Sequence, residues 1–353
     1  MRAVIAALIG FLSAHALAEA PPVTPAHYLR EISGRFSPAK PTVVMSYNVH
    51  YRFLSLNLLQ VADALIEATE GTWRSPGATN DIPCCLINVT LQSPSAARGA
   101  PRGGRVYINS RIVSVVTMPQ LDTLYYLKMT DELLNPIVGS RRDTRNFHVY
   151  DLSGGELKFF AHNLLDGTST TNLTGATDMA AQGREVSRVL TLLSDVYHER
   201  RGPISPDSDF RIFVNCDSKA IPFAARSARD NVNAFGGKYA ALRVDVMPAR
   251  EAPRGARTRD FTVWTASFLE VAGRTRDSAL QRIAAETPAW GMTPLLANYG
   301  MAIGHIRCAL VAMTTRRGDP LAANQVIAAK ARTPAEPTPP LAQLSQDTEQ
   351  AIR

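Results

Sequence analysis

The chain of 353 residues is 45% hydrophobic and 20% charged, a composition typical of a globular protein that buries a substantial core. No segment after the N-terminus is apolar enough to cross a membrane, so the sequence excludes a helical membrane protein. The formal net charge is +7 at pH 7, and many arginines lie in short clusters.

The N-terminus has the pattern of an export signal. Arg2 precedes an apolar run from Val4 to Leu12, and Ala16-Leu17-Ala18 is a small-residue cleavage site. The run is shorter than the roughly 20 residues of a membrane-spanning helix. We therefore expect cleavage after Ala18, a mature chain beginning at Glu19, and a periplasmic location in a Gram-negative bacterium. A Pro-containing lead-in follows at residues 19–41.

Most of the chain that follows reads as β-strand, because β-branched and aromatic residues recur in short runs between turn residues. The motif Ser153-Gly154-Gly155 between two such runs predicts a hairpin. The predicted strands are Thr42 to Phe53, Cys84 to Gln92, Arg105 to Thr117, Leu121 to Met129, Asn146 to Leu152, Glu156 to His162, Phe210 to Val214, Lys238 to Val246, Asp260 to Phe268 and Ile303 to Met313.

Four other segments have different patterns. Apolar residues in Leu56 to Ala68 fit a strand and also helical spacing, and the pattern alone favours a short helix. Thr177 to Arg200 has clear helical periodicity, and Ser278 to Glu286 predicts a shorter helix within an insertion. From Thr314 the chain is polar and Pro-rich, which predicts a disordered tail.

Consecutive strands with one central helix disfavour a parallel α/β sheet. We predict a mainly β protein, built as a large curved antiparallel sheet (an open half-barrel) with one central amphipathic helix. The chain then divides into a signal peptide (1–18), a lead-in (19–41), one β-rich domain (42–313) and a Pro-rich disordered tail (314–353).

Four cysteines offer candidate disulfides: Cys84, Cys85, Cys216 and Cys308. Cys84 and Cys85 are neighbours in a predicted strand, so their side chains should point to opposite faces and should not bond to each other. If bridges form, each would reach Cys216 or Cys308. The alternative is that all four are small buried side chains. No metal-ligand spacing such as C-x-x-C occurs, and no metal or cofactor is predicted.

The order of these pieces, from about Thr42 to Met313, resembles an exported bacterial family known as domain of unknown function 3108. The resemblance implies the open β-half-barrel of periplasmic lipoprotein carriers, a strand at Leu56 to Ala68, and no assigned catalytic residues. It rests on Ser46-Tyr47-Asn48-Val49, on Arg111 to Pro136, on Gly237 to Pro248, on Thr262-Val263-Trp264, on Pro294 and on Ile303-Gly304-His305-Ile306 with Leu310. The chain departs from the family pattern at Leu56, at Thr265-Ala266-Ser267 and in the insertion Glu270 to Gly291.

The sequence contains no H-E-x-x-H motif, nucleophile elbow or P-loop. The one candidate for catalysis is the polar loop Asn163 to Gly175, where Asp166, Ser169 and Thr170 follow His162 closely. The arginine clusters predict solvated basic loops, with anionic envelope lipid as the alternative ligand and no nucleic acid. These clusters are Arg98/Arg102/Arg105, Arg141/Arg142/Arg145 and Arg250/Arg254/Arg257/Arg259.

Three hypotheses for function follow. The first is a non-enzymatic envelope protein that binds a lipid or other apolar ligand on a concave sheet face, lined by strands such as Arg105 to Met129 and Asp260 to Phe268. The second is a scaffold that binds another envelope protein along an open sheet edge. The third is a periplasmic hydrolase, in which His162 and Asp166 would meet at a pocket.

Overall fold

The computed structural model describes residues 24–53, 56–77, 79–99, 106–118, 123–134, 141–153, 158–171, 209–216, 219–248, 261–286, 292–300 and 305–321. At 53, 56–58, 209–216, 219–223, 248 and 292 it describes the backbone alone. Within these residues, no helix has both the length and the apolar character needed to span a membrane.

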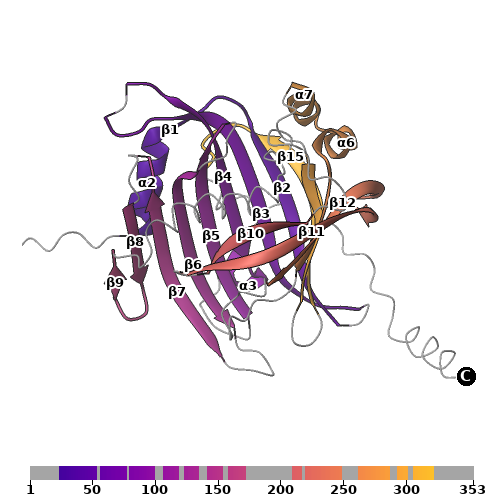
Figure 1. Ribbon diagram of the computed structural model, residues 1–353, viewed down its shortest axis with the longest axis horizontal. Coiled ribbons are helices and arrows are strands. Elements are labelled where there is room, and N and C mark those ends of the chain that lie inside the picture. Colours follow the sequence, from indigo (N-terminus) through magenta and orange to yellow (C-terminus); the bar gives the residue numbers. More distant parts are fainter. Residues whose placement is uncertain are drawn as a thin grey trace, which may run out of the picture.

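One large antiparallel sheet dominates the molecule, as the sequence predicts (Figure 1). Its strands are β1 (Phe36–Pro38), β2 (Thr42–Phe53), β3 (Leu56–Trp73), β4 (Ile82–Gln92), β5 (Val106–Thr117), β6 (Thr123–Leu134), β7 (Arg142–Asp151), β8 (Lys158–Asn163), β9 (Ser169–Thr170), β10 (Asp209–Cys216), β11 (Lys219–Ala234), β12 (Gly237–Pro248), β13 (Phe261–Ser267), β14 (Met292–Gly300) and β15 (His305–Arg316).

The strand order is β10-β11-β12-β13-β14-β15-β2-β3-β4-β5-β6-β7-β8-β9, with β1 paired to β3. Most neighbours follow each other in the chain, so hairpins build nearly the whole sheet. The pairing of β15 with β2 joins the C-terminal strands to the N-terminal ones. The sheet curls strongly and remains open, because β9 and β10, its two end strands, are not paired with each other.

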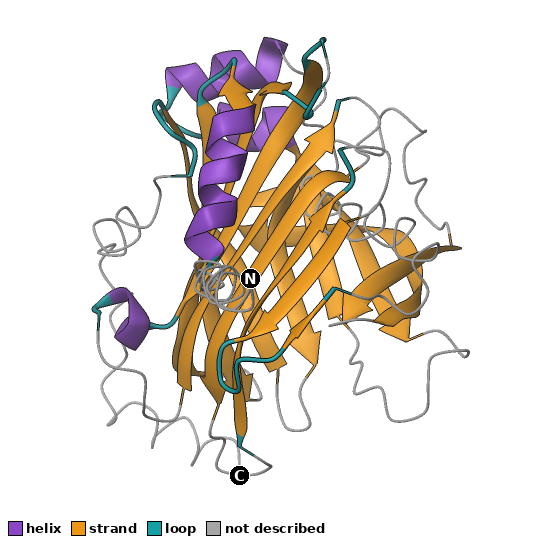
Figure 2. Cartoon of the chain, turned by 90° about the vertical axis from the view of Figure 1, so that its left-hand side faces the viewer, coloured by secondary structure: helices purple, strands orange, loops and turns teal. Residues whose placement is uncertain are grey.

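Helices cover both faces of the sheet. α6 (Phe268–Gly273) and α7 (Ser278–Glu286) pack on one face, which we call the inner face, and α2 (Pro25–Arg35) packs on the opposite, outer face. Figure 2 shows α2 in front of the strands, on the outer side of the curled sheet. The short α3 (Pro94–Ala97) follows β4.

The inner core joins α6 and α7 to several strands. Phe268 and Val271 of α6 and Leu280 and Ile283 of α7 are almost fully buried in one apolar cluster. The strand residues in this cluster include Val43, Met45, Tyr47, Ile66, Cys85, Ile87, Tyr239 and Leu295. The apolar side of each strand in this part of the sheet therefore faces a common core.

The outer core forms under α2. Ile32 of α2 is fully buried and packs with Trp73, Leu127 and Phe147, among others. This helix was not predicted, because the sequence of residues 19–41 indicates a Pro-containing lead-in. Pro25 lies in the first turn of α2, where a missing backbone N–H costs nothing.

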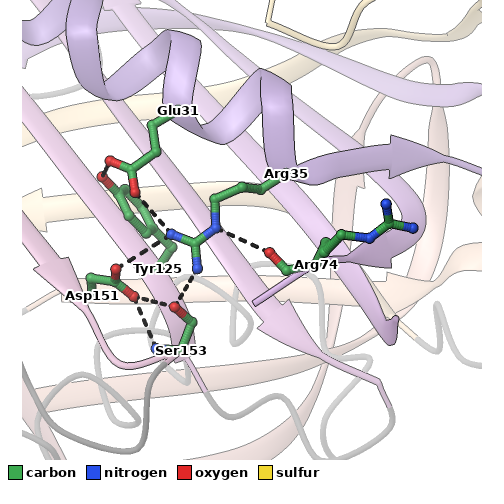
Figure 3. A network of polar contacts seen from close by, with 6 residues as sticks. All are labelled: Glu31, Arg35, Arg74, Tyr125, Asp151 and Ser153. Carbon is green, nitrogen blue, oxygen red and sulfur yellow. Dashed lines mark hydrogen bonds and ion pairs between the residues drawn. The ribbon is translucent and has the colours of Figure 1, made fainter. Parts of the chain in front are cut away.

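Arg35 at the C-terminus of α2 fastens the helix to the sheet (Figure 3). Its Nη1 lies 2.9 Å from Glu31 Oε1 and 3.4 Å from Asp151 Oδ2, and its Nε donates to the carbonyl oxygen of Arg74 at 3.1 Å. Its Nη2 donates to Ser153 Oγ. A single guanidinium thus joins the helix to β7 and to the residue that follows β3.

Aromatic rings complete this attachment. The Arg35 guanidinium carbon lies 4.3 Å from the centroid of Trp73, a side chain with no exposed surface. Tyr125 donates its hydroxyl hydrogen to Glu31 Oε2 at 3.0 Å. Burial, with the nearby Glu31 carboxylate, raises the pKa of Tyr125 above its usual value, so the hydroxyl stays protonated and keeps donating.

The structure corrects the helix favoured at Leu56 to Ala68, which is part of β3. The strand that the resemblance implied is therefore right. Ala62 and Ile66 belong to the inner face, whereas Leu65 and Glu67 belong to the outer face, and all four are buried. A strand buried on both faces carries apolar residues on both sides, and such a run also fits helical spacing.

Other boundaries differ in smaller ways. β15 continues past Met313 to Arg316, so the polar tail begins later than predicted. The strands β11 and β14 were not predicted as separate elements, whereas α7 begins and ends at the predicted residues. The predicted central helix at Thr177 to Arg200 lies outside the described residues.

Candidate functional site

The inner face carries a strip of apolar side chains that are only partly buried. Ala64 of β3 lies opposite Leu91 of β4, and Val89 of β4 lies opposite Ile112 of β5. All four are half-buried: they pack against the surrounding apolar clusters and remain partly exposed to solvent. We call these four residues the inner strip. Adjacent register positions make the strip a continuous surface across three strands.

Polar groups border the inner strip on β6 and β7. Lys128 lies opposite Ile112, and His148 lies opposite Lys128, so both extend the row on the same face. His148 is buried, and its ring packs edge-on against Phe159 with centroids 6.4 Å apart. Ser114 of β5 is fully buried, and its hydroxyl has no hydrogen-bond partner among the described residues. An apolar surface edged by a few polar groups is typical of ligand sites.

A separate pocket of about 220 Å³ lies on the outer face, beside the N-terminal end of α2. Pro25 and Leu29 of α2 form one wall, and Arg111, Met129 and Arg145 of the sheet contribute to the rest. Its volume is below the roughly 300–1,000 Å³ of pockets for drug-sized ligands, and far below what a lipid needs.

The Arg111 guanidinium in this pocket already has hydrogen-bond acceptors within the chain. Arg111 Nε donates to Asn88 Oδ1 at 2.8 Å, and its Nη2 donates to the carbonyl oxygen of Leu321 at 2.8 Å. Asn88 in turn donates to Glu67, which also accepts from Arg316 at 2.8 Å. Burial raises the pKa of Glu67 and lowers the pKa of Arg111. This network ties residues 316–321 to the sheet, so we assign it a structural role.

The candidate catalytic loop forms the hairpin between β8 and β9. His162 Nδ1 lies 2.7 Å from Ser169 Oγ, so a base and a hydroxyl do meet there. Asp166, however, accepts from the Thr168 hydroxyl at 2.7 Å and from the Asn163 amide at 2.9 Å. The hydrogen bonds from the hydroxyl and the backbone N–H of Thr168 lower the pKa of Asp166.

Residues 164–171 of this loop are exposed, whereas His162 and Asn163 are half-buried. His162 and Asp166 lie at the surface, and neither lines the pocket described above. Asp166 therefore stabilises a turn and does not orient the imidazole. A hydrolase needs a nucleophile, an oriented base and a place for substrate. The described residues of this loop supply a hydroxyl beside a base, but no carboxylate that orients the base. Thr170 pairs with Ala161 as part of β9.

The cysteines lie on both faces of the sheet. Cys85 belongs to the inner core and Cys84 to the outer core, so their predicted opposite orientation is confirmed. Cys84, Cys85 and Cys308 are free thiols, and the side chain of Cys216 lies outside the described residues. Burial raises the pKa of Cys84 and of Cys308 to about 12. The bridges predicted from Cys84 or Cys85 to Cys308 are therefore not formed in this structure.

Of the clustered arginines, those at 98, 141, 142 and 145 are exposed within the described residues. Arg141 pairs with Asp143 at 3.5 Å. The described part of the chain contains no cluster of histidine, cysteine and carboxylate side chains arranged to hold a metal ion.

The four residues of the inner strip were not predicted as site residues, although three of them lie in predicted strands.

Comparisons with known proteins give the chain no family. No family model matches it, and no curated protein is similar to it. One similar solved structure is the beta-barrel-like protein of domain of unknown function DUF1849 from Brucella abortus. It shares 6% sequence identity, with a TM-score of 0.34, over 80% of this chain and 100% of that chain. A likeness of this size says nothing about function. The resemblance to domain of unknown function 3108 has no matching family model behind it.

Proposed function

We propose that the chain is an exported bacterial envelope protein that binds a lipid or other apolar ligand on the concave inner face of its sheet. The observation that supports the proposal is the inner strip of Ala64, Val89, Leu91 and Ile112, four half-buried apolar side chains in adjacent register. Export rests on the signal pattern of residues 1–18, and membership of domain of unknown function 3108 is part of the same proposal.

The physical basis is the surface that the strip leaves open to water. Each Å² of apolar surface removed from water contributes about 25 cal/mol. Val89 and Ile112 pack against the buried apolar clusters beside the strip. A ligand that covers the strip therefore extends this apolar packing. Lys128 and His148 border the same row and offer polar contacts to one end of a ligand. An acyl chain with a polar end group fits this arrangement.

A neutral fluorescent probe, N-phenyl-1-naphthylamine, tests the proposal without any contribution from charge. We expect saturable binding to the wild-type chain and loss of that binding in Ile112→Asp, which places a carboxylate in the strip. Leu269→Asp is the matched control, because Leu269 is 57% exposed on α6 and is not one of the four residues of the strip. Equal binding by wild type and both variants, or no binding by any, contradicts the proposal.

The open ends of the sheet support a second candidate, a scaffold that binds another envelope protein by a sheet edge. β9 pairs only with Ala161 and His162 of β8, so most of β8 has no neighbour on that side among the described strands. A photo-reactive residue at the exposed Lys158 should then cross-link to one partner in vivo. The absence of a cross-link specific to Lys158, against the same residue placed at Leu269, contradicts the scaffold.

A further inference from the structure

Four basic side chains lie together on the outer face, at one end of the β2–β15 pair. Arg52 is directly opposite His305, and His50 is directly opposite Arg307. Residues two apart in a strand share a face, so the four side chains occupy the corners of one small square. Neighbours across the strands are about 5 Å apart at Cβ, and neighbours along a strand about 7 Å apart. All four are half-buried.

The strands on either side add little negative charge. On β14, Asn298 lies opposite Arg307 and Gly300 lies opposite His305. The neighbouring strand on this side therefore contributes an amide and a residue without a side chain. On β3, Gln60 lies opposite His50 and donates to Asp63 Oδ1 at 2.7 Å. The Asp63 carboxylate acts on His50, where it opposes the larger effect of burial and raises the pKa of the imidazole. The amide, glycine and glutamine at these positions bring no charge to the square.

The basic groups perturb one another. Among the described residues, Arg307, His50 and His305 have no hydrogen-bond or ion-pair partner, and Asn298 Oδ1 is buried without a partner. Burial and the charge of Arg52 lower the pKa of Arg307. Burial and both guanidinium groups lower the pKa of His305. Half-buried like charges of this kind cost free energy unless an anion binds between them.

We propose that the square formed by His50, Arg52, His305 and Arg307 binds a phosphate-class oxyanion, either a free phosphate or the phosphate of a lipid headgroup. Guanidinium groups form paired hydrogen bonds to phosphate oxygens, and imidazole N–H groups donate to the remaining oxygens. A dianion also offsets the two permanent charges, which a single carboxylate does not. This site is on the opposite face from the inner strip and does not depend on the function proposed for that strip.

The first test is calorimetric titration of the full chain with inorganic phosphate at neutral pH. We expect saturable binding to wild type, and affinity lower by about tenfold or more in Arg307→Gln and in His305→Gln, since each variant loses a charge-assisted contact. Arg282→Gln on α7 is the control, because Arg282 is an exposed arginine outside the square. No saturable binding to wild type, or equal binding by Arg307→Gln and Arg282→Gln, overturns the proposal.

Thermal unfolding separates an anion site from a structural one. In phosphate-free buffer, Arg307→Gln should be as stable as wild type or more stable, because it removes repulsion with Arg52. Phosphate should then raise the melting temperature of wild type and leave that of Arg307→Gln unchanged. Destabilisation of the variant in the absence of phosphate, with the same response to phosphate as wild type, would show a structural role and overturn the site.

Vesicles distinguish the source of the phosphate. Binding to phosphatidylglycerol vesicles, absent with phosphatidylcholine and absent in Arg307→Gln, assigns the site to an anionic headgroup. Binding of inorganic phosphate without vesicle binding assigns it to a free phosphate. Sulfate stays a dianion at and below neutral pH, so it should bind more tightly as the pH falls through the lowered pKa values of His50 and His305, where both gain protons beside Arg52, Arg307 and Asp63.

Discussion

Removal of the Arg35 guanidinium should release α2 from the sheet and destabilise the protein strongly. The Arg35 side chain is 11% exposed and lies within ion-pair distance of Glu31 and Asp151, whose side chains are 33% and 18% exposed. Arg35→Ala leaves both carboxylates without this cation and removes the cation–π contact with Trp73. It also removes the hydrogen bond to the carbonyl oxygen of Arg74.

The magnitude follows from these contacts. Removing one partner of a buried ion pair costs about 3–5 kcal/mol, and the partial exposure of Glu31 places this pair at the lower end of that range. The cation–π contact accounts for about 1 kcal/mol of the same loss and does not add to it in full. We therefore expect Arg35→Ala to lower the free energy of unfolding by about 3 kcal/mol.

Urea denaturation of Arg35→Ala and of Arg30→Ala checks this reasoning. Arg30 is exposed on the same helix, so its replacement has the same effect on helix propensity without the loss of the contacts. Arg30→Ala should change stability by about 0.5 kcal/mol or less. A difference between the two variants of under about 0.5 kcal/mol would refute the role given to Arg35. Arg35→Lys should be intermediate, because an ammonium keeps the charge but cannot bridge as many acceptors.

Four further predictions concern other parts of the molecule. Ile32→Ala should lower the free energy of unfolding by about 3 kcal/mol in the same urea assay, since Ile32 has no exposed surface. Cys84 and Cys308, whose pKa values burial raises to about 12, should resist iodoacetamide at pH 8 until the protein unfolds, as read by mass spectrometry. Because the pKa of His305 is lowered in the fold, its neutral form is favoured, and in phosphate-free buffer stability should fall as the pH drops below about 6.5. His305→Gln should show less of this loss in urea titrations at several pH values. Mass spectrometry of the mature protein should find Glu19 at its N-terminus, whereas an uncut chain contradicts the proposed export signal.

Local patterns in the sequence predict the sheet well where one strand face differs from the other. β2 begins and ends at the predicted residues, and the Ser153-Gly154-Gly155 motif lies between the paired strands β7 and β8. Cys84 and Cys85 point to opposite faces because the period of a strand is two residues. These features depend on neighbours in the chain, so a single sequence contains them.

Elements that depend on distant contacts were harder to predict. β3 is buried on both faces, which removes the alternation that marks a strand. β11 contains Pro222 and Asp230, residue types that are uncommon in a strand interior, yet it pairs with β10 from Lys219 to Arg226 and with β12 from Phe223 to Ala234. The helix α2 is short, and Ile32 is its one fully buried side chain, so its stability comes from packing and from Arg35.

The candidate sites illustrate the same limit. The inner strip combines residues of β3, β4 and β5 that become neighbours only through register. The basic square joins positions 50 and 52 to positions 305 and 307, which are far apart in the chain. The arginine clusters that were visible in the sequence include none of these positions. A cluster assembled by strand pairing leaves no local signal, so the fold was needed to find it.

The most direct test of the proposed function is mass spectrometry of an organic extract of the protein, purified gently from its native host. We predict one apolar molecule per chain in the wild-type protein and a marked loss of it in Ile112→Asp, with Leu269→Asp unchanged. A wild-type protein that is folded and carries no apolar molecule would contradict a tightly held ligand on the inner face.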